Sequence, residues 1–197
     1  MGVIKTALEI ALEKTENVKS DKSSIDQFEA KRQGKKLANA FLTGEINLQD
    51  EIKKTPLGEK DSLKQGIYDV LITQITLPVN DDDDKKLEAI GKGFSFILDS
   101  KKNDLSSIFK QLARIYSQYK EESSHYDQAI RQQYASKLRK KEEEVSRRLG
   151  REVRIDPMQD PEFIAFYNQH INTLKSNYEG VIDQFKEEIK KMFAGVK

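Results

Sequence analysis

The sequence predicts an all-α protein in which short N-terminal helices precede a long antiparallel helical hairpin with coiled-coil-like packing. Residues 103–151 contain no proline, and their apolar residues recur every three or four positions, as on a helix with one buried face. Residues 161–193 repeat the pattern in steps of mostly three and four, which is typical of helices packed along a seam. Between the two segments, Pro157 and Pro161 prevent one continuous helix. Asp160 is predicted to cap the second helix, because a proline and an acidic residue follow it.

The helix expected from Asn103 to Arg151 would be roughly 70 Å long. Because a helix gains most of its stability from packing, one this long needs a partner, and residues 161–193 supply it. We place the centre of the turn near Asp156, which would set Leu138 opposite Leu174 and Tyr134 opposite Tyr178. The apolar positions of the final helix are Ile164, Tyr167, Ile171, Leu174, Tyr178, Val181, Phe185, Ile189 and Met192.

The N-terminal part divides into shorter elements in chain order. We expect amphipathic helices over residues 1–18, 24–42, 46–54 and 59–75, although the β-branched residues at 72–77 leave a short strand open. Gly34 interrupts the second helix. The acidic run at residues 81–84 marks the start of another helix that ends near Ser100, because acidic side chains favour helix N-termini. We therefore divide the chain into an N-terminal helical region, 1–102, and the hairpin, 103–197, which together form one cooperative unit.

Composition excludes several classes of function. The net charge is +1, so no overall field draws the protein to nucleic acid or membrane. Cysteine is absent, which excludes disulfides and thiolate chemistry. No apolar run approaches the length of a membrane span, and residues 2–14 alternate apolar and charged residues unlike a secretory signal. We expect a cytoplasmic protein.

Two histidines are the main candidates for metal chemistry. Glu122 and His125 form one Glu-x-x-His pair of the kind used in di-iron helical bundles, but the second pair is lacking around His170. The expected hairpin register also keeps the histidines far apart. We predict no metal, no cofactor and no catalytic residue, and a metalloenzyme is the weakest of three functional classes.

Four arginines gather at the expected hairpin tip: Arg147, Arg148, Arg151 and Arg154. The glutamates at 142–144 would pair with lysines three or four residues away, so a solvated, salt-bridged helix face also explains this pattern. The functional interpretation is contact with an anionic partner such as RNA, phosphate or an acidic protein surface.

The first half of the long helix carries more apolar surface than one partner helix can cover. We expect the N-terminal helices, a second copy of the chain, or both to cover it. The residues proposed for self-association are Leu105, Phe109, Leu112, Tyr116 and Tyr119.

Together these features favour a non-enzymatic interaction or scaffold protein that forms a homo-oligomer through its hairpin or binds a helical protein partner. The alternative is a nucleic-acid- or ribosome-associated protein that uses the basic tip.

The opening residues 1–15, MGVIKTALEIALEKT, together with residues 34–38, GKKLA, and Leu77-Pro78, resemble an uncharacterised bacterial family with a domain of unknown function. The resemblance lies mainly in the first eighty residues. It implies a bacterial cytoplasmic protein and supplies no activity or site residue.

Overall fold

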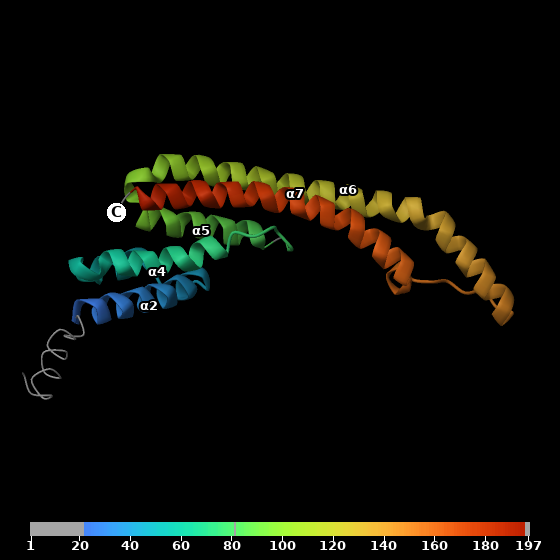
Figure 1. Ribbon diagram of the computed structural model, residues 1–197, viewed down its shortest axis with the longest axis horizontal. Coiled ribbons are helices and arrows are strands. Elements are labelled where there is room, and N and C mark those ends of the chain that lie inside the picture. The colour runs from blue at the N-terminus through green and yellow to red at the C-terminus, as the bar shows by residue number, and fades with distance from the viewer. Residues whose placement is uncertain (1–21, 81, 196–197) are drawn as a thin grey trace, which may run out of the picture. The chain divides into compact units, whose positions relative to one another are not determined.

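The computed structural model describes residues 22–80 and 82–195, and within them every regular element is helical (Figure 1). The predicted helix over residues 1–18 lies outside this range. The α-helices are α2 (Lys22–Leu42), α3 (Leu48–Lys54), α4 (Lys60–Thr73), α5 (Asp83–Ile97), α6 (Lys102–Leu149) and α7 (Pro161–Ala194). Short 3-10 helices lie at Leu57–Glu59, Asp99–Lys101 and Pro157–Gln159. The all-α prediction is confirmed, and no described helix is long and apolar enough to span a membrane.

The described residues form two compact units. The N-terminal unit contains residues 22–74 and 92–100, and the hairpin unit contains residues 75–91 and 101–195. Helix α5 therefore contributes its first half to the hairpin unit and its second half to the N-terminal unit.

Helices α2 and α4 cross at two glycines in the N-terminal unit. A Cβ atom on Gly34 would lie 2.1 Å from the carbonyl oxygen of Leu63, and one on Gly66 would lie 2.0 Å from that of Lys31. Both distances are shorter than any real contact, so only glycine permits this backbone approach. Beside the crossing, Asp69 on α4 forms an ion pair with Lys31 on α2 at 2.9 Å. Gly34, which the sequence presents as a cost to helix stability, is thus a packing requirement.

This crossing predicts whether a glycine-to-alanine substitution raises or lowers the free energy of unfolding. Helix propensity alone would make Gly66→Ala stabilising, but the clash with the Lys31 carbonyl should lower the free energy of unfolding by about 2–3 kcal/mol. Gly180 is the matched control because it is exposed within α7 and a Cβ there meets nothing within 4 Å. Gly180→Ala should raise stability by about 0.5–1 kcal/mol. Urea denaturation followed by circular dichroism measures both, and a stabilised Gly66→Ala would contradict the crossing.

In the hairpin unit, α6 and α7 pack side by side (Figure 1). One apolar cluster joins Tyr119 to Ile171 and Leu174, and a second joins Ile130 and Tyr134 to Phe163. Edge-to-face ring contacts hold each cluster, with centroids 5.2 Å apart for both Tyr119–Tyr178 and Tyr134–Phe163. The predicted hairpin and its apolar seam are therefore confirmed.

The predicted register of the hairpin is wrong. Tyr134 lies against Phe163 rather than Tyr178, whose ring contacts Tyr119 instead. The chain reverses at Gly150, in the left-handed conformation with φ +65°, and not near Asp156. Residues 151–156 then run back beside α6 before α7 begins. The prolines that suggested the turn lie beyond it, Pro157 in the 3-10 helix and Pro161 at the first position of α7.

Candidate functional site

The residues predicted for self-association are interior residues of the hairpin unit. Leu105, Leu112, Tyr116 and Tyr119 are buried, with at most 7% of any of them exposed, and Phe109 is half-buried. The apolar surface beyond the reach of α7 is therefore already covered within one chain.

Part of this cover comes from residues 75–91. The Tyr116 hydroxyl donates a hydrogen bond to the Thr76 carbonyl oxygen at 2.5 Å, and burial raises the pKa of Tyr116 to about 12. Leu77 packs against the cluster of Tyr119. An ion pair between Lys120 and Asp84, 2.9 Å apart, fixes the start of α5 on the same helix. Sequence periodicity indicated that a face was covered, but it could not identify this segment.

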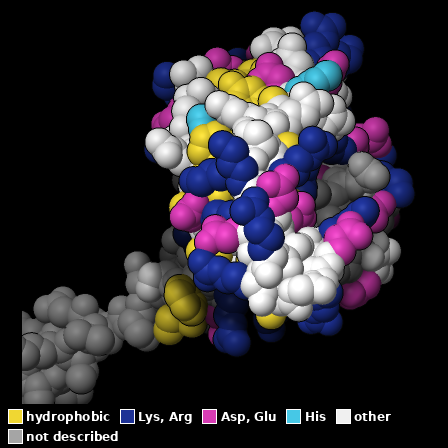
Figure 2. All heavy atoms as spheres, turned by 90° about the vertical axis from the view of Figure 1, so that its right-hand side faces the viewer, with side chains coloured by type: hydrophobic (Ala, Val, Ile, Leu, Met, Phe, Trp, Pro, Cys, Tyr) yellow, Lys and Arg dark blue, Asp and Glu magenta, His cyan; other side chains and the backbone are white. Residues whose placement is uncertain are grey.

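The tip arginines are exposed and mostly paired with neighbours. Arg147 lies 3.9 Å from Glu143, Arg148 pairs with Glu144, and Arg154 lies 3.7 Å from Glu152. Arg151 makes no ion pair with any described residue. Figure 2, which looks onto this end of the hairpin, shows basic and acidic side chains interleaved. The tip is therefore a mixed surface, as expected of a solvated, salt-bridged helix end.

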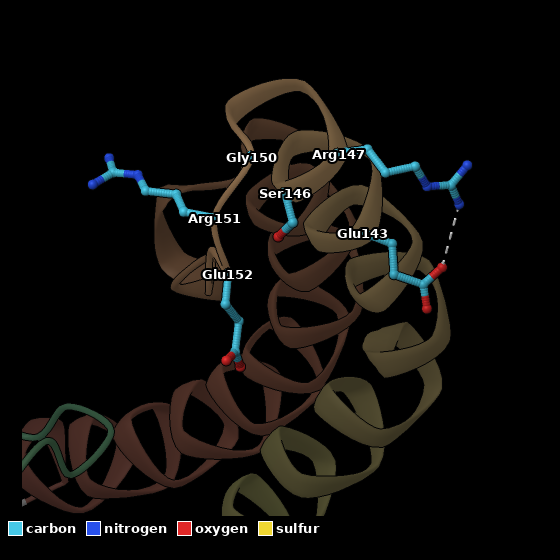
Figure 3. Close-up of a pocket in the computed structure, with 6 residues that line it drawn as sticks. All are labelled: Glu143, Ser146, Arg147, Gly150, Arg151 and Glu152. Carbon is cyan, nitrogen blue, oxygen red and sulfur yellow. Dashed lines mark ion pairs between the residues drawn. The ribbon is translucent and has the colours of Figure 1, made fainter.

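A shallow depression lies at the tip, between the end of α6 and the returning segment. It is lined by Glu143, Ser146, Arg147, Gly150, Arg151 and Glu152. Figure 3 shows Arg147 and Arg151 extending in opposite directions from it. Because they diverge, these two guanidinium groups do not converge on one phosphate-sized anion.

Side chains of α6 hold the returning segment in place. The Val153 N–H donates to Ser146 Oγ, and the Ile155 N–H donates to Glu142 Oε1, both at 2.9 Å. Glu142, which we expected to pair with a lysine on the same helix, instead satisfies a backbone donor of the loop. These bonds set how far the chain returns along α6 before α7 starts.

A polar cluster closes the loop where α7 begins. Asp160, only 6% exposed, caps α7 by accepting a hydrogen bond from the Glu162 N–H at 3.1 Å. The same carboxylate accepts hydrogen bonds from Lys141 at 2.8 and 2.9 Å and from the Tyr134 hydroxyl at 3.1 Å. Glu162 also pairs with Lys137, at 2.7 Å. The sequence identified Asp160 as a cap, but the incorrect register concealed its partners on α6.

Electrostatics within this cluster favour the charged forms of its carboxylates and lysines. The hydrogen bond from Lys141 is the main reason that the pKa of Asp160 lies below its usual value of 3.8, and burial opposes this shift. The same hydrogen bond, which Lys141 donates to Asp160, raises the pKa of Lys141. Hydrogen bonds from Lys137 and Lys141 lower the pKa of Glu162.

Asp160→Asn tests the charge separately from the cap, because asparagine also caps helices well. The variant should be less stable than the wild type at pH 7, since it lacks the carboxylate that binds Lys141. Because the pKa of Asp160 is lowered on folding, its contribution is complete above about pH 5 and is lost as the pH falls through the folded-state pKa.

Thermal unfolding of both proteins between pH 7 and pH 2.5 measures this effect, and the two melting temperatures should converge at acidic pH. Asp183→Asn, which removes an exposed partner of Lys186, serves as the control and should change little at any pH. A difference between Asp160→Asn and wild type that is independent of pH would show that the ion pair contributes nothing.

The histidines differ in environment. His125 is exposed, whereas His170 is half-buried against Phe166, with ring centroids 4.6 Å apart. The observed register places them at nearly the same level of the hairpin, in contrast to the prediction. Among the described residues, no group of three or more histidine or carboxylate side chains is placed to hold a metal ion.

One aromatic residue of the apolar series of α6 remains uncovered. Tyr126 is 45% exposed in the middle of the helix, although it follows the same spacing as the buried Tyr119 and Ile130. On α7, Phe166 lies nearby in the register and is half-buried. Periodicity alone does not separate the centre of a seam from its margin, so the spacing of Tyr126 does not reveal its exposure.

The comparisons with known proteins identify a family but no activity. The chain belongs to the Family of unknown function (DUF6657), which it matches over residues 49–191. The expectation of a family without an assigned function is thus confirmed, but its placement in the first eighty residues is wrong, because the match covers mainly the C-terminal part. No curated protein and no solved structure matched the chain.

Proposed function

We propose that this member of the family is a non-enzymatic interaction or scaffold protein that self-associates through its long helical hairpin. The observation that carries the proposal is the exposure of Tyr126 midway along α6. A large aromatic side chain that stands at core spacing, yet is left 45% exposed by the described residues, is a typical feature of a protein–protein contact.

The construction of the hairpin supports a binding role. Apolar clusters brace α6 and α7 at two levels, and the cluster around Asp160 fixes the loop end. Exposed side chains on such a frame keep fixed positions, so a partner loses little free energy in ordering them.

Self-association can be measured directly. The wild-type protein should behave as a dimer or larger oligomer in light scattering after size-exclusion chromatography, and the apparent mass should fall on dilution. Raising the salt concentration should leave the oligomer intact, because the exposed feature that carries the proposal is apolar. A strict monomer at high protein concentration would count against the proposal.

The alternative is that the tip contacts an anionic partner such as RNA. The observation in its favour is that Arg151 lacks an ion pair among the described residues, while the pairs of Arg147 and Arg154 are long. Binding through the tip requires affinity that declines steeply with salt and is lost when Arg147, Arg148, Arg151 and Arg154 are changed to alanine. The matched control replaces Lys85 and Lys86, outside the hairpin tip, and should leave RNA binding unchanged.

A further inference from the structure

We propose that a second copy of this chain docks on one uncharged face of the hairpin, so that two hairpins pack into a four-helix arrangement. This inference rests on the proposed function, because it assumes that the protein self-associates and assigns the contact. The face consists of Tyr126, Ala129 and Gln133 on α6 and Phe166, His170 and Thr173 on α7.

Helical spacing places these residues in two stripes. Steps of three and four residues keep Tyr126, Ala129 and Gln133 on one side of α6, and the same steps keep Phe166, His170 and Thr173 on one side of α7. Lys137 lies four residues after Gln133 on the α6 stripe, and Glu162 lies four residues before Phe166 on the α7 stripe. Their side chains form an ion pair at 2.7 Å. Because this pair bridges the two helices, the stripes lie on the same side of the hairpin.

This side differs from the one that residues 75–91 cover. Asp84 of that segment pairs with Lys120, which precedes Tyr126 by six residues and so lies about 120° away around α6. The stripes are open instead. Ala129, Gln133 and Thr173 are exposed, Tyr126 is 45% exposed, and the two aromatic rings of the α7 stripe are half-buried.

The face carries no lysine, arginine, aspartate or glutamate in a chain that is 34% charged. The contributing part of α7, residues 163–174, has no such residue at any position. Charged groups border the face instead, with Glu122 one turn before Tyr126 and the Lys137–Glu162 pair at the other end. An uncharged centre with aromatic side chains and a charged rim is the composition of a protein–protein interface.

The chemistry of the face favours a second copy as the partner. An oppositely charged macromolecule would find no charge to complement. The amide of Gln133 and the hydroxyl of Tyr126 each donate and accept hydrogen bonds, so identical groups can pair across a two-fold axis. Carboxylates or ammonium groups could not pair with copies of themselves. The small side chains of Ala129 and Thr173 allow the facing helices to approach closely.

A matched pair of substitutions tests the assignment. Gln133→Lys puts a charge within the face, whereas Gln128→Lys makes the same change at another exposed position of α6, about 140° away around the helix. Sedimentation equilibrium should show the dimer dissociation constant of Gln133→Lys raised about a hundredfold, because each dimer would bury two unpaired charges. Gln128→Lys should match the wild type. Ala129→Glu should weaken the dimer similarly, since a charge of either sign is desolvated.

The outcomes separate this inference from the function on which it rests. If the wild type is a dimer and both Gln133→Lys and Ala129→Glu remain equally dimeric, another surface mediates association and the assigned face is wrong. If the wild type is itself monomeric, self-association fails and the inference fails with it. Circular dichroism of each variant confirms that the hairpin is folded.

Labelling gives a second, independent readout. The chain contains no cysteine, so Gln133→Cys and Gln128→Cys each introduce a single site for a spin label. Dipolar coupling between protomers should be strong for the label at position 133 and weaker for that at 128. The reverse order would overturn the assignment.

Discussion

The reversal of the chain between α6 and α7 sets every surface of the hairpin. Gly150 ends α6 in a left-handed conformation that a side chain would disfavour, so the chain turns back at once. The returning backbone then bonds to Ser146 and Glu142, and Asp160 binds Lys141 while capping α7. A shift of α7 by one turn would break the contact of Asp160 with Lys141 and leave its buried carboxylate short of partners.

Much of the fold could be predicted because helical periodicity is a local property. Both hairpin helices begin and end within two residues of the predicted positions, and the cap at Asp160 was identified from its own sequence context. The register was not predictable in this way. It depends on whether the loop turns at Gly150 or at the prolines, and both are common turn signals. The hydrogen bonds that decide between them join residues distant in sequence.

The candidate surfaces show the same limit. Tyr116, Tyr119 and Tyr126 are separated by three and seven residues, both of which are helical spacings, yet Tyr126 alone of the three is exposed. What differs is the cover, because Thr76 and Leu77 reach the first two residues from a separate part of the chain. Periodicity indicates that a helix face is apolar, but which residues cover that face is determined by tertiary packing. The arginines lie at the tip as predicted, whereas their pairing and divergence depend on how the loop folds back on α6.

Charged side chains are distributed unevenly along the hairpin, with ion pairs at the tip and uncharged side chains midway along it. At the tip, exposed pairs such as Arg147 with Glu143 contribute at most about 1 kcal/mol each, so their main effect is to keep the surface hydrated. Midway along the hairpin, the chain carries aromatic and amide groups where lysine or glutamate would cost a monomer nothing. Apolar clusters brace the helices at this level, so the face is presented without further ordering. The rigidity of this face and its lack of charged side chains are the basis of our proposal that it contacts protein, and its neutrality favours a partner that is equally neutral.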